Sequence, residues 1–203
     1  KFIFIHIPKC AGESVSSALK FKCEQKVSDF KYEKLRSTKH ETIAECITVD
    51  QTHKDYFKFS FVRNPWDRML SLWAYYKKCR YKPVSDVNFR YFIKNLEEAA
   101  CSVQNHVYTD SHRKINMLYP QYHFISDWWG NNILDFIGRF ENLQEDFDIV
   151  CDKIGIPRRK IPHKNSTKHK HYSEYYDDET QEIVAEKYAK DIEYFEYEFE
   201  NDT

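Results

Sequence analysis

The sequence predicts an α/β fold, because three short apolar runs are each followed by a segment with the pattern of a helix. The runs are residues 2–5, 57–62 and 133–140, and the first of them is continuously apolar, which suits a strand buried on both faces. No internal repeat or linker interrupts the chain, and its 203 residues fit the usual size of one domain. We therefore expect a single domain over residues 1–203, with strands and helices alternating along it.

The loop that follows the first run has the features of an anion-binding site. It spans residues 6–14, His-Ile-Pro-Lys-Cys-Ala-Gly-Glu-Ser, and a helical pattern begins at Val15. A strand that turns sharply into a helix presents backbone N–H groups and the positive end of the helix dipole. Lys9 adds a charge, Gly12 permits a close backbone approach, and Ser14 adds a hydroxyl. The Walker A pattern is absent, since Lys9 precedes Gly12, and an ordinary turn with one surface lysine explains these residues equally well.

The second run is followed at once by Arg63-Asn64-Pro65, which predicts the start of a helix. Asn64 is a good N-cap and Pro65 a good first helical residue. Apolar residues then recur at helical spacing, at Trp66, Met69, Leu70, Trp73 and Tyr76. Arg63 stands at a strand end, where ligands gather in α/β proteins, and Ser71 lies two helical turns on. A guanidinium and a hydroxyl suit phosphate oxygens, although Arg63 could instead form a capping ion pair with Asp67.

The rest of the chain predicts three further helices and one basic loop. Apolar residues at helical spacing predict helices within residues 89–96, 143–154 and 184–195. Residues 158–172 contain six Lys or Arg, three His and no acid, so this loop could close over an anion. Residues 174–203 contain twelve acidic residues against two lysines, which predicts a solvated acidic face.

Composition excludes several classes of protein. The net charge of -1 argues against a general nucleic-acid coat, and 41% hydrophobic residues argue against wholesale disorder. No run approaches the ~20 apolar residues of a membrane span. The six cysteines form no CxxC pair and no zinc-finger spacing, so we expect free thiols and no metal site. A short chain without an anchor favours a soluble cytoplasmic protein, and a place in the Golgi lumen would follow if an N-terminal anchor had been removed.

Together, the two loops carry a resemblance to a known family. Residues 6–14 and the later segment Phe-Val-Arg-Asn-Pro-Trp-Asp-Arg-Met-Leu-Ser over 61–71 resemble the nucleotide-binding loops of the carbohydrate-type sulfotransferases. These enzymes transfer a sulfuryl group from 3′-phosphoadenosine 5′-phosphosulfate (PAPS). The family loops read approximately H-x-P-K-T-A-G-T-S and F-V-R-N-P-x-x-R-x-x-S, and the pair in this order is specific.

The resemblance extends over nearly the whole chain. Further similar segments lie at Pro120-Gln121, 138–143, Asn165-Ser166 and 191–199. What it implies for the fold is a P-loop-like three-layer sandwich, with a central, mainly parallel sheet flanked by helices.

The resemblance also implies roles for individual residues. Lys9 would contact the 5′-phosphosulfate and stabilise the leaving oxygen, while Arg63 and Ser71 would bind the 3′-phosphate. Backbone N–H groups of the loop and the serine hydroxyl would hold the 5′-phosphate. The positions concerned are Cys10, Ala11, Gly12, Glu13 and Ser14. The product nucleotide would be PAP, and the resemblance implies no metal.

Two loop residues depart from the family pattern. Cys10 stands where the family usually has Thr or Ser, which loses a good hydroxyl donor. Glu13 stands where Thr is common, and a carboxylate beside a phosphate is unfavourable unless it points away. These departures raise a second interpretation, in which the chain is a module that binds PAP or PAPS without turnover.

Sulfuryl transfer needs a base for the acceptor hydroxyl, and histidine titrates in the useful range. We favour His40, which lies between the two loops in Lys-His-Glu-Thr, where family members often have His-x-Ser or His-x-Thr. The weaker candidates are His6, His53, His112 and Glu13. The expected acceptor is a saccharide or glycoconjugate, and Trp128-Trp129 offers aromatic faces for a sugar ring.

Two other functions are weighed against sulfuryl transfer. A small-molecule kinase with an atypical phosphate loop is disfavoured, because the GK[ST] sequence and a convincing metal-binding Asp after an apolar strand are absent. A pure interaction protein would bind neither PAPS nor PAP, and the two-loop resemblance argues against it. The sequence leaves the oligomeric state open.

Overall fold

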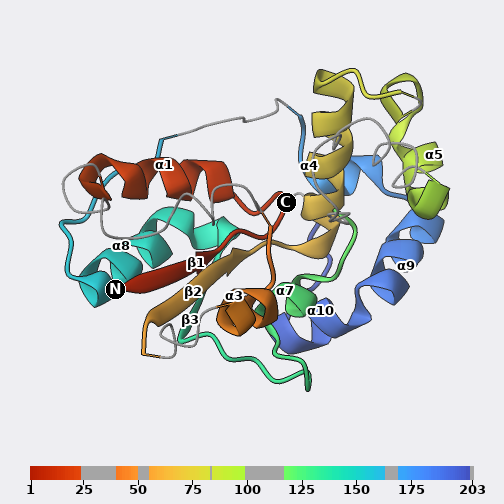
Figure 1. Cartoon of the computed structure of the whole chain (residues 1–203). Helices are drawn as coiled ribbons and strands as arrows, with labels where there is room; N and C mark the ends of the chain where they lie inside the picture. Colours follow the sequence, from red (N-terminus) through yellow and green to blue (C-terminus); the bar gives the residue numbers. More distant parts are fainter. Residues whose placement is uncertain (24–39, 50–54, 83, 99–116, 163–168, 202–203) are drawn as a thin grey trace. The chain divides into compact units, whose positions relative to one another are not determined.

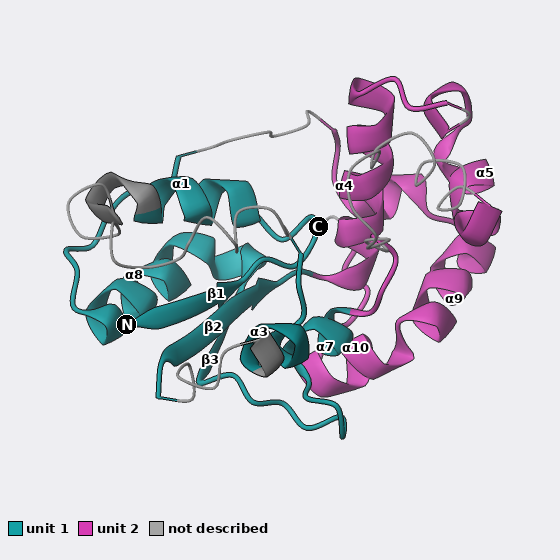
Figure 2. Cartoon of the chain, viewed as in Figure 1, with its two compact units in different colours: residues 1–63, 121–166 teal, residues 64–120, 167–203 magenta. Residues whose placement is uncertain are grey.

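A computed structural model describes the chain in six segments, which are residues 1–23, 40–49, 55–82, 84–98, 117–162 and 169–201. Two compact units share the chain (Figure 2). The first contains residues 1–63 and 121–166, and the second contains residues 64–120 and 167–203. Each unit has its own hydrophobic core.

The first unit is built on a parallel sheet, whose described strands lie in the order β1-β2-β3 (Figure 1). These strands are β1 (Phe2–Ile5), β2 (Phe57–Val62) and β3 (Phe136–Arg139). Phe4 pairs with Phe59, and Phe59 pairs with Phe136. Because all three strands run the same way, their carboxyl ends meet at one edge, where α/β proteins bind ligands. The predicted α/β fold is confirmed.

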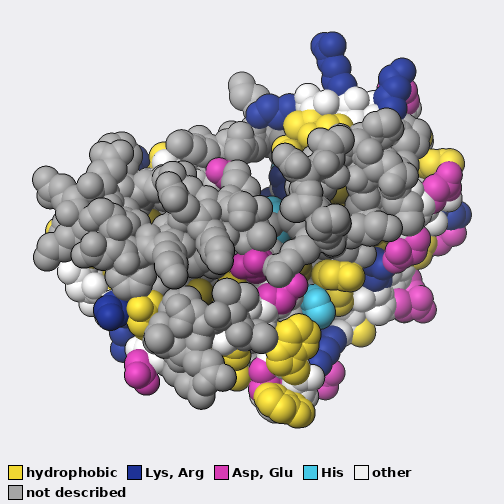
Figure 3. Space-filling model, viewed as in Figure 1, with side chains coloured by type: hydrophobic (Ala, Val, Ile, Leu, Met, Phe, Trp, Pro, Cys, Tyr) yellow, Lys and Arg dark blue, Asp and Glu magenta, His cyan; other side chains and the backbone are white. Residues whose placement is uncertain are grey.

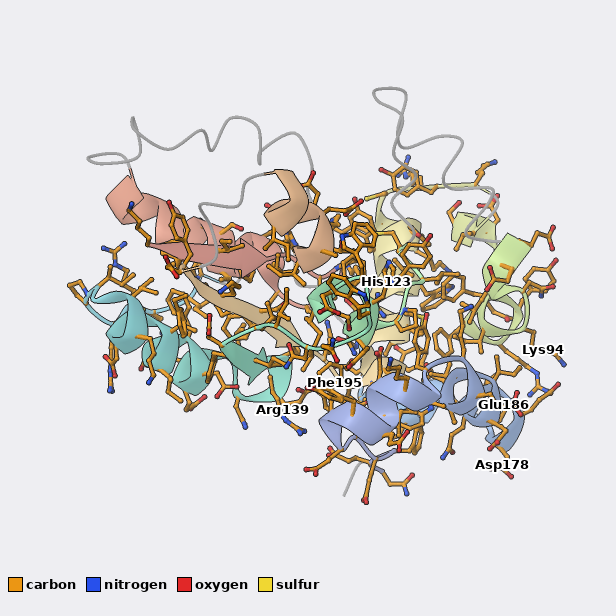
Figure 4. All side chains as sticks on the ribbon, turned by 60° about the horizontal axis from the view of Figure 1, so that its bottom comes forward. Lys94, His123, Arg139, Asp178, Glu186 and Phe195 are labelled. Carbon is orange, nitrogen blue, oxygen red and sulfur yellow. The ribbon has the colours of Figure 1, made fainter. Side chains whose placement is uncertain are left out.

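Helices lie on both sides of this sheet. Helices α1 (Gly12–Cys23) and α8 (Leu143–Ile154) share one core with the rings of Phe59 and Phe61 on β2. Helices α3 (Ile43–Val49) and α7 (Gln121–Ile125) pack against each other. Figures 1 and 4 show α3 on the opposite side of the sheet from α8. The result is the predicted parallel sheet flanked by helices.

The second unit is helical where the structure describes it. Its elements are α4 (Pro65–Lys78), η3 (Val84–Asp86), α5 (Phe89–Lys94), η5 (Tyr172–Tyr175), α9 (Asp178–Lys187) and α10 (Ala189–Phe195). Helix α4 packs against α5 and α9 over an aromatic core. An ion pair joins Lys94 of α5 to Glu179 of α9, and Figure 4 shows Lys94 on the side of α5 that borders α9.

Helix α4 begins as the sequence predicts. The Asn64 side-chain oxygen accepts a hydrogen bond from the Trp66 N–H at 3.1 Å, and Pro65 is the first helical residue. The Asn64 Nδ2 also donates to the Glu198 carbonyl at 2.9 Å. The cap therefore ties the start of the helix to the C-terminal segment of the same unit, in addition to satisfying a backbone donor.

The third strand is shorter than predicted. It covers only residues 136–139 of the apolar run 133–140. Its expected first residue belongs to a local turn instead, because the Ile133 N–H donates to the Ile125 carbonyl, next to an antiparallel bridge between Ser126 and Asn132. A 3-10 turn, η4 (Phe140–Asn142), then leads into α8.

The helix predicted within residues 184–195 is two helices. The backbone leaves the helical conformation at Tyr188, where φ is -113° and ψ is 24°. The Tyr188 side chain is fully buried, and its hydroxyl donates to the Leu118 carbonyl at 3.1 Å. Because Val184 and Ile192 face the same core on either side of the break, the apolar spacing is that of one continuous helix.

The described cysteines are free thiols, as predicted for Cys10, Cys46, Cys79 and Cys151. Among the described helices, none combines the length and the apolar character that crossing a bilayer requires. Figure 3 shows Lys and Arg side chains interspersed with Asp and Glu over the described part of the visible face. This mixture agrees with the near-zero net charge of the sequence.

Candidate functional site

The loop between β1 and α1 has a backbone that suits an anion. Lys9 and Ala11 adopt the left-handed conformation, with φ of 68° and 59°, whereas Cys10 between them does not. Such alternation turns successive N–H groups toward one side, and these concave groups of donors bind anions. Left-handed backbone costs a non-glycine residue roughly 1–2 kcal/mol. The contacts around the loop must therefore hold this conformation.

Helix α1 starts at the end of the loop and adds further donors. The N–H groups of Ser14 and Val15 donate to the Ala11 carbonyl at 2.9 and 3.1 Å. Within the described segments, the N–H groups of Ala11 and Gly12 have no hydrogen-bond acceptor. Donors of this kind at a helix start, together with the helix dipole, favour a bound phosphate.

Glycine is required at position 12 because a neighbouring side chain fills the space that a Cβ would need. A Cβ at this position would lie 1.8 Å from Cδ2 and 2.0 Å from Nε2 of the His6 ring. The sequence suggested that Gly12 permits a close backbone approach, and the group that approaches in the structure is this imidazole. The ring stacks near Phe4, with centroids 6.0 Å apart, so it is held on more than one side.

His40, the favoured base, lies directly against the start of the loop. Its Nδ1 is 2.7 Å from the His6 carbonyl oxygen, and its ring meets the His6 ring edge to face, with centroids 4.4 Å apart. Its own backbone is left-handed, with φ of 81°. The structure thus brings together two residues that are 34 positions apart in the chain.

The contact with His6 also assigns the protons of the His40 ring. A carbonyl oxygen can only accept a hydrogen bond, so the His40 Nδ1 must carry the hydrogen. In the neutral ring, Nε2 is then the nitrogen with the basic lone pair. This tautomer is the one required if His40 is to take a proton through Nε2.

Gln121 joins the end of β2 to the loop. Its Oε1 accepts hydrogen bonds from the Arg63 N–H at 2.8 Å and from the Cys10 thiol at 3.1 Å. Its Nε2 donates to the Arg63 carbonyl at 2.8 Å. Gln121 is fully buried, at 0% exposure. These three hydrogen bonds therefore lie in the protein interior.

The thiol of Cys10 has a place in this interior. Cys10 is 1% exposed, and its sulfur lies 3.5 Å from the Pro8 carbonyl as well as 3.1 Å from Gln121. The thiol therefore donates within the protein, and the departure from the family's Thr or Ser replaces one buried donor by a weaker one. The backbone of Cys10 keeps its position between the two left-handed residues of the loop.

Arg63 reaches from the end of β2 to two neighbouring segments. One guanidinium nitrogen donates to the Lys9 carbonyl at 3.2 Å, and the guanidinium carbon lies 3.9 Å from the centre of the Phe140 ring. The side chain is 7% exposed. A guanidinium stacked on an aromatic face keeps a fixed orientation while its plane offers several N–H donors.

The roles of the other predicted residues stay predictions. Ser71 is 7% exposed on α4, in the second unit, so its pairing with Arg63 on one phosphate stays a prediction. Glu13 lies in the first turn of α1. His53, His112 and residues 163–168 of the basic loop lie outside the described residues.

A turn in the first unit exposes two aromatic residues. Trp128 and Trp129 are 66% and 84% exposed. The Asp127 carboxylate accepts from the N–H groups of Trp129 and Asn131, at 3.0 and 2.8 Å, which fixes the turn. The described side chains include no group of three His, Cys, Asp or Glu that could hold a metal ion.

Sequence reasoning missed the connecting residues of this site. The sequence places Gln121 in a segment similar to the family, but it does not predict the contact of Phe140 with Arg63 or that of His6 with Gly12. The signal that could have found Gln121 is a polar residue within a largely aromatic stretch, Tyr-Pro-Gln-Tyr-His-Phe over residues 119–124. Its partners lie 58 and 111 positions away in the chain, and no local pattern reveals them.

Comparison with known proteins identifies the family. The model of the Sulfotransferase family matches residues 1–198. The chain belongs to the sulfotransferase family. This membership confirms the resemblance drawn from the two loops and, with the parallel sheet and its flanking helices, the P-loop-like fold. Sulfotransferases move a sulfuryl group to an acceptor, and the family typically takes it from PAPS.

One curated relative is an uncharacterized protein of Archaeoglobus fulgidus. It is 36% identical to this sulfotransferase over 104 residues, which cover 50% of the chain and 70% of the relative. No solved structure matches the chain.

Proposed function

We propose that this sulfotransferase uses PAPS to sulfate a hydroxyl group of a saccharide or glycoconjugate. The observation that carries the proposal is the loop with alternating backbone handedness, against whose first residue the His40 ring packs. The loop supplies donors and the Lys9 charge for the 5′-phosphosulfate, and Arg63 and Ser71 bind the 3′-phosphate. Cys10, Ala11, Gly12, Glu13 and Ser14 complete the cradle of the 5′-phosphate.

The proposed transfer is in-line and is driven by positioning and charge. The acceptor oxygen forms a bond to sulfur while the bond between sulfur and the 5′-phosphate oxygen breaks. The acceptor proton goes to Nε2 of His40, and the charge that develops on the phosphate oxygen is stabilised by Lys9. The products are the sulfate ester and PAP, and no metal takes part.

The position of His40 favours turnover over binding alone. A module that only bound PAP would have no use for a histidine fixed beside the loop in the Nδ1–H tautomer. The burial of the Cys10 thiol also removes one motive for that alternative, because this side chain does not have to contact the nucleotide. Glu13 remains the residue whose charge opposes a phosphate, and the helix start offsets part of that repulsion.

We further propose that both units act as one sulfotransferase domain. The family match runs through residues of both units. Arg63 ends the first segment of unit one, and Ser71 lies eight residues on in unit two.

The first experiment is a calorimetric titration of PAP into the wild-type protein, with EDTA present, and into Arg63→Ala. Wild-type binding that weakens at least tenfold in Arg63→Ala supports the nucleotide site, and EDTA separates it from a metal-dependent kinase. A matched pair of lysine variants tests the role of Lys9. Lys9→Ala should abolish sulfate transfer from labelled PAPS, whereas Lys153→Ala, on the exposed face of α8, should retain it. Absence of PAP binding by the wild type would refute the proposal.

A further inference from the structure

Gln121 occupies an unusual position in the first unit. Its side-chain amide makes one hydrogen bond to the N–H and one to the C=O of the same residue, Arg63, both at 2.8 Å. A side chain that pairs with both backbone groups of one residue replaces a rung of a β-ladder. Strand β2 ends at Val62, so Gln121 satisfies both backbone groups of the residue that directly follows the strand.

The same amide reaches the phosphate loop. Its oxygen also accepts from the thiol of Cys10, and the guanidinium of Arg63 donates to the carbonyl of the adjacent Lys9. Two consecutive loop residues are thus held by the pair formed by Gln121 and Arg63. All of these contacts lie within the first unit.

The consequence concerns the direction of the Arg63 side chain. With the backbone fixed by Gln121 and the guanidinium lying 3.9 Å from the centre of the Phe140 ring, few rotamers are open to it. A fixed guanidinium loses less conformational entropy when it binds a phosphate, and that gain appears as affinity. The contribution of Arg63 should therefore depend on Gln121, although Gln121 itself lies in the interior.

We propose that Gln121 is a positioning residue that sets how strongly this sulfotransferase prefers nucleotides with a 3′-phosphate. The proposal rests on the proposed function, in which Arg63 binds that group. Gln121 acts through Arg63, by holding its backbone, and it keeps Arg63 in register with the loop that holds the 5′-phosphosulfate.

The test compares the affinities of PAP and 5′-AMP, which lacks the 3′-phosphate, for a set of variants. In Gln121→Leu, the ratio of the two affinities should fall at least tenfold and come within threefold of the ratio in Arg63→Ala. The double variant should show no further loss. The KM for PAPS should rise at least tenfold while kcat at saturating PAPS changes less than threefold.

Gln144→Leu is the matched control. Gln144 on α8 makes a clamp of the same kind, since its Oε1 accepts from the Ile161 N–H at 2.9 Å and its Nε2 donates to the Arg159 carbonyl at 2.8 Å. These hydrogen bonds involve neither the phosphate loop of residues 6–14 nor Arg63. Its loss should lower the free energy of unfolding and leave the ratio of PAP to 5′-AMP affinity unchanged.

Gln121→Glu adds a pH dependence of the affinity ratio, which a general loss of stability would not produce. A glutamate carboxylate accepts from the Arg63 N–H but cannot donate to the Arg63 carbonyl, whereas a protonated glutamic acid can do both. The affinity ratio of Gln121→Glu should therefore recover toward wild type as the pH falls from about 7.5 to about 5, relative to the wild-type ratio at each pH.

The outcomes are distinguishable. A wild-type protein that does not bind PAP refutes the proposed function. A wild type that binds PAP, with an unchanged affinity ratio in folded Gln121→Leu, refutes the role of Gln121 alone. If Gln121→Leu does not fold, an absence of pH recovery in Gln121→Glu overturns the proposal.

Discussion

The substitution Gly12→Ala tests how the phosphate loop is held. The added Cβ would lie 1.8 Å from Cδ2 of His6, and ordinary contact begins at 3.4 Å, so the imidazole has to move by about 1.6 Å. The ring cannot move alone, because His40 packs edge to face against it and is hydrogen-bonded to the carbonyl of the same residue. We therefore expect both stability and turnover to fall.

The magnitude follows from two opposing effects. Overpacking of a well-packed site costs about 1–3 kcal/mol. Gly12 is the first residue of α1 and its φ is not positive, so alanine would otherwise stabilise the helix by about 0.5–1 kcal/mol. Removing the ring with His6→Ala should expose that gain. Gly12→Ala is thus expected to destabilise the wild type and to stabilise the His6→Ala protein.

The assay is a double-mutant cycle measured by denaturant unfolding, with kcat recorded for each folded variant. The expected interaction free energy is about 1–3 kcal/mol, and near the midpoint each kcal/mol shifts Tm by about 2–4 °C for a chain of this size. An equal effect of Gly12→Ala in both backgrounds would refute the reasoning, since the imidazole would then not be what excludes the side chain.

Three further predictions follow from single contacts. His40→Ala should lower kcat by roughly 10²–10⁴-fold with PAP affinity within threefold of wild type; unchanged turnover would mean that another group takes the proton. Cys10→Ser should keep a donor to Gln121, so its free energy of unfolding in denaturant should exceed that of Cys10→Ala by about 1 kcal/mol. A Cys10→Ala protein more stable than Cys10→Ser would contradict the buried hydrogen bond. Burial raises the pKa of Tyr188, so its hydroxyl stays protonated and donates to Leu118. Tyr188→Phe should therefore lower the free energy of unfolding by about 1–3 kcal/mol, and no change in urea unfolding would count against that bond.

Local features of the fold could be predicted from the sequence because their causes are local. The cap of α4 requires only Asn64, the N–H two residues on, and the proline between them. Strand β1 can be recognised as a continuous apolar run, since both faces of a parallel sheet are covered, and β2 can be recognised as an aromatic run in which Lys58 and Ser60 alternate with phenylalanines. The two loops could be placed for the same reason, as each directly follows a strand.

The features that were missed depend on contacts between distant parts of the chain. The break at Tyr188 leaves the apolar spacing intact and is marked by neither Gly nor Pro, so periodicity alone cannot reveal it. The need for glycine at position 12 depends on the orientation of the His6 ring, and the role of Gln121 depends on the position of the Arg63 backbone. Composition and spacing could name the residues of the candidate site, but not the contacts that position them.

The division of the chain between the two units has a consequence for biosynthesis. The core of the first unit includes Phe59 from β2 and Phe147 from α8, and residues 64–120 of the second unit are synthesised between them. When β1, α1 and β2 have left the ribosome, the apolar face that α1 and α8 share still lacks α8. A nascent chain in this state exposes hydrophobic strands, which makes it prone to aggregation. The protein is therefore expected to depend on chaperones during synthesis more than a chain whose units follow one another in sequence.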